Sequence, residues 1–124
     1  MYVKVSKLEC NGDGKSCTVL ALAKAKQLPF YVAQALAAGL GRQPNNGFNF
    51  YTLAKAANLK EHKVQNWKAK SGFRRCRVDS FLRENPVGRF VVKVPGHVFA
   101  VIDGKVHDTM YQPMRIVRAV WEVV

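Results

Sequence analysis

The chain has 124 residues, 48% of them hydrophobic, which suffices for one compact core and is too short for two ordinary domains. No apolar run reaches the roughly 18 residues of a membrane span, and the first ten residues lack the apolar centre and cleavage site of a signal peptide. We therefore expect no membrane partner and no secretion by a signal peptide. A net charge of +12 indicates polyanions, such as nucleic acid, or acidic proteins as candidate partners.

The cysteines predict neither a disulfide framework nor a metal site. Cys10, Cys17 and Cys76 are odd in number and form no CxxC pair, which favours reduced thiols in a cytoplasmic type of setting. The three histidines add no closely spaced ligand pair that would nucleate a zinc site. We expect no metal and no cofactor.

The first two thirds of the chain are predicted to be mainly helical. A short edge strand at 2–6 and a polar loop precede a helix at 17–25, with Ser16 as its N-cap. This helix has apolar side chains on every face of its first two turns, so we expect it to be buried in the middle of the domain. Further helices are expected at 30–39, 50–58, 61–70 and 78–85.

The last third changes to strands, which are expected at 89–94, 97–102, 105–110 and 115–124. Asp103 and Gly104 form a typical hairpin turn between the second and third of them, and the whole set reads as an antiparallel meander. Helices followed by strands indicate the α+β class. We therefore predict a single domain, 1–124, with N-terminal helices packed on a C-terminal antiparallel sheet.

The hairpin register brings a histidine and an aspartate together. With Asp103 and Gly104 at the centre of the turn, Phe99 faces Asp108 across the strand pair. Side chains two apart on a strand share a face, so His97 and Asp108 lie on one face as diagonal neighbours, about 7–8 Å apart between Cα atoms. A carboxylate at that place can orient an imidazole that acts as a general base.

Cys17 is the candidate nucleophile for this pair. The start of a helix lowers the pKa of a thiol through its partial positive charge, and a protonated histidine lowers it further. Asn11, six residues earlier, is a candidate donor to an oxyanion, together with the backbone N–H of Cys17. Taken alone, a cysteine before an apolar helix is an inert core residue and a histidine at a strand start is structural. The set Cys17, His97 and Asp108 is typical of acyl-transfer catalysis.

Two stretches, "NGDGKSCTVLALA" and "GRFVVKVPGHVFAVIDGKVHDT", resemble the papain-like cysteine peptidases. In that family a polar loop with a Gln six residues before the nucleophile leads to a Cys at the start of a central helix, and a His and an Asn or Asp follow on an antiparallel sheet. The order "SCTVLALAKAKQLPFYVAQALAAGLGR" and then "FLRENPVGRFVVKVPGHVFAVIDGKVHDT" is also similar to a group of small bacteriophage proteins with this arrangement.

The resemblance implies a papain-like fold and thiolate attack on a peptide or isopeptide bond of a peptide or protein substrate. It implies Cys17 as nucleophile, His97 as general base, Asp108 as its orienter and Asn11 in the oxyanion position. A phage origin implies the host cytoplasm or the virion as the location. Asn11 is one methylene shorter than the Gln of the family, and the chain is smaller than a full peptidase. A related protein without catalytic activity therefore remains an alternative.

A different function is indicated by the basic helical segment 50–77. Its part 53–72 is similar to a DNA-binding helix-turn-helix, with Asn58 at the left-handed turn position and the second helix beginning near Leu59. Such a segment would contact nucleic acid or an acidic host protein without any catalysis; two packed helices with a solvated basic face are the plainer interpretation. The candidate contact residues are Lys60, Lys63, Lys68, Lys70, Arg74, Arg75 and Arg77.

Overall fold

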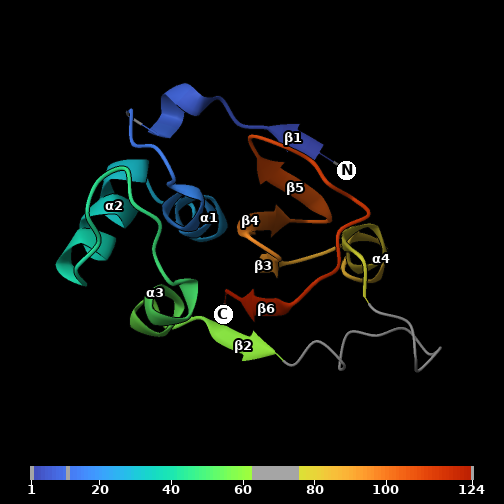
Figure 1. Ribbon diagram of the computed structural model, residues 1–124. Helices are drawn as coiled ribbons and strands as arrows, with labels where there is room; N and C mark the ends of the chain where they lie inside the picture. Colours follow the sequence, from blue (N-terminus) through green and yellow to red (C-terminus); the bar gives the residue numbers. More distant parts are fainter. Residues whose placement is uncertain (1, 11, 63–75, 124) are drawn as a thin grey trace.

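A six-stranded sheet forms the middle layer of the computed structural model, which describes residues 2–10, 12–62 and 76–123 (Figure 1). The strand order is β1-β5-β4-β3-β6-β2, and all neighbours are antiparallel except β1 and β5, which run parallel. The strands are β1 (Tyr2–Lys4), β2 (Lys60–His62), β3 (Arg89–Val94), β4 (His97–Ile102), β5 (Lys105–Asp108) and β6 (Ala119–Glu122).

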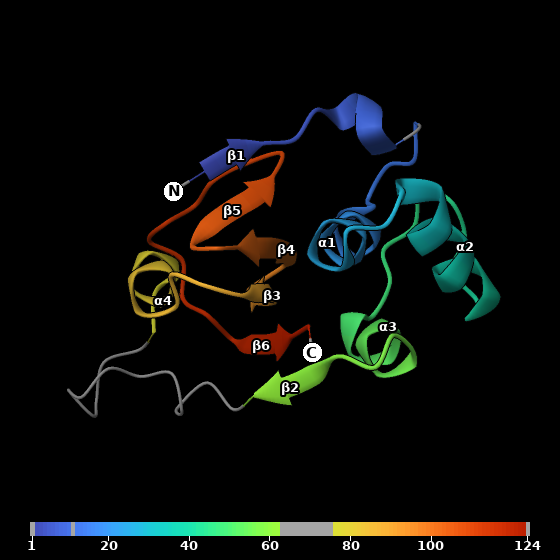
Figure 2. The same cartoon turned by 180° about the vertical axis from the view of Figure 1, so that it is seen from behind.

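Helices cover both faces of this sheet, as Figures 1 and 2 show from opposite sides. The N-terminal helices α1, α2 and α3 lie on one face, and the short α4 lies on the other. The fold is therefore α+β, as the sequence predicts. The helices are η1 (Lys7–Cys10), α1 (Cys17–Lys26), α2 (Phe30–Gly39), α3 (Phe50–Ala56) and α4 (Val78–Glu84).

The helix α1 is the central helix of the molecule. Val19 and Leu22 pack into the main core with Val98, Ala100 and Trp121 of the sheet, while Leu20 belongs to a smaller cluster with Val5 and Cys10. Seven of its ten residues are buried, because apolar side chains occur on every side of the helix. The prediction of a buried middle helix is confirmed. Within the described ranges, no helix combines the length and hydropathy that crossing a membrane requires.

The β4–β5 hairpin has the register that the sequence predicts. Ile102 pairs with Lys105, and Ala100 pairs with His107. Asp103 and Gly104 both have positive φ angles, 49° and 75°, as a two-residue turn of type I′ requires. The strand pair therefore ends with His97 and Asp108 close together at one end of the sheet.

The prediction of a purely C-terminal, antiparallel meander is wrong in two respects. The sheet also includes β1 and β2 from the first half of the chain, and β1 adds a parallel edge beside β5. In addition, β6 pairs with β3 rather than with β5. Between β5 and β6 the chain crosses back to the other side of β3, and Val117 N–H in this connection donates to Cys76 O (2.7 Å). Val120 and Trp121 can then be buried on the two faces of the sheet.

The second helix expected in the basic segment does not begin near Leu59. Asn58 takes the left-handed conformation, with a φ of 59°, as predicted, but the chain then runs as β2 along β6. Lys60 pairs with Glu122 in this register, and His62 Nε2 lies 2.9 Å from Glu122 Oε1. Pairing with a free strand edge therefore replaces the helix at Lys60–His62. The rest of the expected 61–70 helix lies outside the described residues.

Candidate active site

Cys17 is the first residue of α1 and is partly buried. Ser16 occupies the N-cap position, but its side chain does not cap the helix: its hydroxyl donates to Asp13 O (2.9 Å). The prediction of Ser16 as the N-cap is therefore confirmed in position, but the residue makes no capping hydrogen bond through its side chain. The backbone N–H groups in the first turn of α1 therefore do not donate to the Ser16 side chain. Their partial positive charge acts on Cys17.

His97 and Asp108 form a hydrogen-bonded pair, as the hairpin register predicts. His97 Nε2 donates to Asp108 Oδ2 (2.6 Å), and Thr109 N–H donates to Asp108 Oδ1 (2.8 Å). Asp108 is only 2% exposed. Each carboxylate oxygen thus has a fixed partner, and the carboxylate in turn fixes the imidazole ring. The other ring nitrogen, Nδ1, remains for Cys17.

Cys17 and His97 lie close enough for each to change the acidity of the other. Burial raises the pKa of the Cys17 thiol, but hydrogen bonds from His97 and from the backbone of Val98 bring it below its ordinary value of 9.0. Burial lowers the pKa of His97, but hydrogen bonds to Asp108 and Cys17 raise it to about 9. Both shifts favour a thiolate beside an imidazolium, which is the reactive form of a cysteine nucleophile.

A buried ion pair holds the loop that leads to Cys17. Arg42 Nη1 and Nη2 donate to the two carboxylate oxygens of Asp13 (2.6 and 2.8 Å), and both side chains are 2% exposed. Gln34 Nε2 (2.9 Å) and Asn45 N–H (2.8 Å) also donate to this carboxylate. The hydrogen bonds from Arg42 lower the pKa of Asp13 to about 2. We call Asp13 and Arg42 the loop clamp.

The positive charge of Arg42 in the loop clamp also acts on Cys17. The hydrogen bond to Asp13 raises the pKa of Arg42, and the negative charge of Cys17 adds to this shift. The interaction is mutual, so the guanidinium favours the thiolate. Gly14 N–H donates to Asn45 Oδ1 (2.6 Å), which ties the Cys17 loop to the segment after α2. Sequence reasoning did not identify Asp13 or Arg42, because no spacing rule connects positions in two separate loops.

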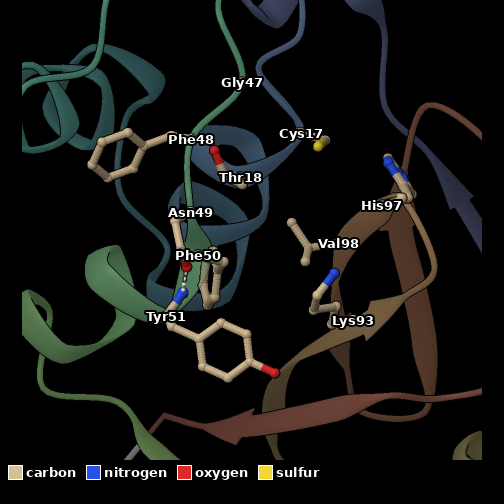
Figure 3. A pocket seen from close by; sticks show the side chains of 11 residues that line it. Cys17, Thr18, Gly47, Phe48, Asn49, Phe50, Tyr51, Lys93, His97 and Val98 are labelled. Carbon is tan, nitrogen blue, oxygen red and sulfur yellow. Dashed lines mark hydrogen bonds between the residues drawn. The ribbon is translucent and has the colours of Figure 1, made fainter.

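Cys17 lies where two pockets meet. Cys17, Gly47, Gly96 and His97 line both of them. One, the aromatic pocket of about 430 Å³, is shown in Figure 3. Its other lining residues are Thr18, Phe48, Asn49, Phe50, Tyr51, Lys93 and Val98. The other, the loop pocket of about 630 Å³, extends from Cys17 along the loop at 12–16 to Thr109 and Met110. An extended chain bound at the Cys17 thiol would therefore have room on both sides of it.

Thr18 adds an unsatisfied polar group to the aromatic pocket. Its Oγ1 is buried and has no hydrogen-bond partner among the residues that the structure describes. Buried hydroxyl groups nearly always have a partner, and the exceptions gather at functional sites. The residue directly after Cys17 thus leaves a polar atom unpaired beside the pocket.

The other residues predicted for function have separate outcomes. Asn11 lies outside the described residues, so its oxyanion role remains a prediction. Lys60 is exposed in β2, and Arg77 precedes α4, where its Nε donates to Asp79 Oδ1 (3.1 Å). Across the described parts of the chain, no group of three or more His, Cys, Asp or Glu side chains is arranged to hold a metal ion. The remaining predicted contacts also lie outside the described residues: Lys63, Lys68, Lys70, Arg74 and Arg75.

Comparisons with models of protein families, with curated proteins and with solved structures found no match. The chemistry of the site therefore follows from its own residues and their geometry.

Proposed function

We propose that this protein is a cysteine peptidase, or a closely related thiol hydrolase, that cleaves a peptide or isopeptide bond. One observation carries the proposal: a cysteine at the start of the central helix lines the same pockets as a histidine whose Nε2 is held 2.6 Å from a buried carboxylate. The position of Cys17 between two pockets supports it, because a chain substrate needs room on both sides of the attacked carbonyl.

The proposed reaction proceeds in two steps. The Cys17 thiolate attacks the carbonyl carbon, a C–S bond forms, and backbone N–H groups at the start of α1, with Asn11, stabilise the oxyanion. His97 gives its proton to the departing amine as the C–N bond breaks. A water molecule then attacks the thioester while His97 takes its proton, and the acid product leaves Cys17 ready for another cycle. Asp108 keeps the imidazole oriented throughout.

The papain-like arrangement forms part of the same proposal. A nucleophile on a central helix, followed later in the chain by the histidine and the carboxylate on neighbouring strands, supports it. The basic residues would bring the enzyme to an acidic partner, and the net charge of +12 supports this part.

The test is the rate at which iodoacetamide alkylates Cys17 as a function of pH. Because the pKa of Cys17 is lowered, the rate should rise at a pH below that of an ordinary thiol. In His97→Ala the rise should move to higher pH, and the rate near neutrality should fall by up to about tenfold for each unit of the shift. Mass spectrometry of the labelled peptides identifies the site, and the buried Cys10 and Cys76 serve as internal controls. A Cys17 that reacts like an ordinary thiol, with or without His97, would exclude the proposed function.

A further inference from the structure

The aromatic pocket beside Cys17 has the composition of a subsite for one side chain of the substrate. Phe48, Phe50 and Tyr51 provide aromatic lining, and Val98 adds aliphatic surface. Figure 3 shows Phe48 and Phe50 on the opposite side of the drawn group from Cys17 and His97. A side chain next to the scissile bond can therefore enter the pocket while its backbone stays at the thiol. Its aliphatic part would pack against the aromatic lining.

Lys93 adds a positive charge to this pocket, beyond the Cys17–His97 pair. Lys93 belongs to β3, where it pairs with Val98 of β4, and Figure 3 shows its side chain extending from the strand toward Val98. No Asp or Glu is among the residues that line the pocket. Lys93 also forms no ion pair with any residue in the described ranges. Its ammonium group is therefore available to a negative charge that enters from outside.

We propose that the aromatic pocket binds an acidic side chain of the substrate, a carboxylate on a short aliphatic stem such as that of glutamate. The carboxylate pairs with the Lys93 ammonium, and the methylene groups contact Phe48 and Phe50. Partial shielding by the aromatic lining strengthens such a pair relative to one in open water. This assignment rests on the proposed function, because it describes what is held beside the Cys17 thiolate. It makes Lys93 a residue that determines specificity and takes no part in bond cleavage.

Two reagents that differ only in one charge test the assignment. N-bromoacetyl-glutamate α-amide and N-bromoacetyl-glutamine α-amide carry the same electrophile and have nearly the same shape. Wild-type protein should be alkylated at Cys17 about fivefold faster by the glutamate reagent, as expected for one partly exposed ion pair. Lys93→Gln should remove this preference, and Lys93→Arg should retain it.

Lys105→Gln is the matched control. It removes the same charge at the far end of the hairpin from His97, so it should keep the preference. Iodoacetamide separates the two proposals. If Cys17 reacts slowly with iodoacetamide in the wild type, the proposed function fails and the assignment fails with it. If Cys17 is fast with iodoacetamide but the two glutamyl reagents react equally, or Lys93→Gln keeps the preference, the pocket assignment alone is wrong. Far-ultraviolet circular dichroism of each variant verifies that it is folded.

Discussion

At the level of single residues, the lowered pKa of Cys17 depends on neighbours that act at different ranges. His97 acts at the shortest range and lowers the pKa of Cys17, which favours the thiolate. Asp108 acts through His97, because its bond to Nε2 fixes the ring. Arg42 acts through charge alone and is held by Asp13. His97 has the largest part in lowering the pKa of the thiol, Asp108 fixes the His97 ring, and Arg42 adds a favourable charge.

Gly47 offers a substitution that separates binding from folding. It borders both pockets, and a Cβ added there would meet no atom within 4 Å. In Gly47→Leu the new side chain should occupy the place where the substrate passes the thiol. We expect the free energy of unfolding to change by less than about 0.5 kcal/mol, as for an ordinary surface change. Alkylation of Cys17 by a bromoacetyl dipeptide should slow markedly.

The control for this variant is Gly39→Leu. Gly39 ends α2, and a Cβ there also meets nothing within 4 Å, but the residue borders neither pocket. Its alkylation rate should equal that of the wild type. Equal rates in Gly47→Leu and the wild type would show that the substrate does not pass Gly47.

At the level of structural elements, the loop clamp joins two loops that line the pockets beside Cys17. Asp13 belongs to the loop before α1, and Arg42 follows α2 and donates from Nε to Asn46 O (3.0 Å). Buried charges are stable only when they are paired and hydrogen-bonded. Among the described residues, the carboxylate of Asp13 accepts four hydrogen bonds, two from Arg42 and one each from Gln34 and Asn45. Both loops therefore depend on one ion pair.

Removing one partner of the loop clamp should destabilise the protein strongly. Arg42→Met leaves the Asp13 carboxylate buried without its cation, which costs about 3–5 kcal/mol of unfolding free energy. The double variant Asp13→Asn, Arg42→Met should regain part of this loss, because no buried charge remains. Urea denaturation measures all three. Arg77→Met breaks a partly exposed ion pair with Asp79 and should change stability far less.

The clamp also predicts an acid transition. The pKa of Asp13 is about 2 in the folded protein against an ordinary 3.8, so its stabilising effect is complete above 3.8 and is lost as the pH falls toward 2. The double variant should lack this part of the pH dependence. If Arg42→Met is as stable as the wild type at neutral pH, the clamp does not hold the loops.

At the level of the whole molecule, local sequence rules predicted the hairpin register and the central helix. They did not predict which distant strands pair in the sheet. The turn at Asp103 and Gly104 fixes the hairpin register, so the His97–Asp108 pair was predictable from the sequence alone. The all-round apolar pattern likewise identified α1 as the central helix. In contrast, β6 is short and apolar and fits several strand edges, and its place beside β3 depends on the path of the whole chain.

The same limit explains the residues that were missed. Asp13 pairs with Arg42, and Lys93 lines the same pocket as Phe50, only because segments distant in sequence come together in the folded chain. The aromatic pocket is formed by three segments that are distant in sequence, and no motif marks it. Candidate site residues next to a turn or a helix start can thus be predicted from the sequence. The residues that line the pockets around them cannot.

The most direct test of the central claim is the time course of hydrolysis of a p-nitrophenyl ester of an acetylated dipeptide. Wild-type protein should release a burst of nitrophenol as Cys17 is acylated, followed by steady turnover as water releases the acyl group. Intact-mass measurement should find the acyl group on Cys17 during the burst. Cys17→Ser and His97→Ala should lack both phases. A wild type that hydrolyses the ester no faster than Cys17→Ser, or an acyl adduct that never turns over, would contradict the account.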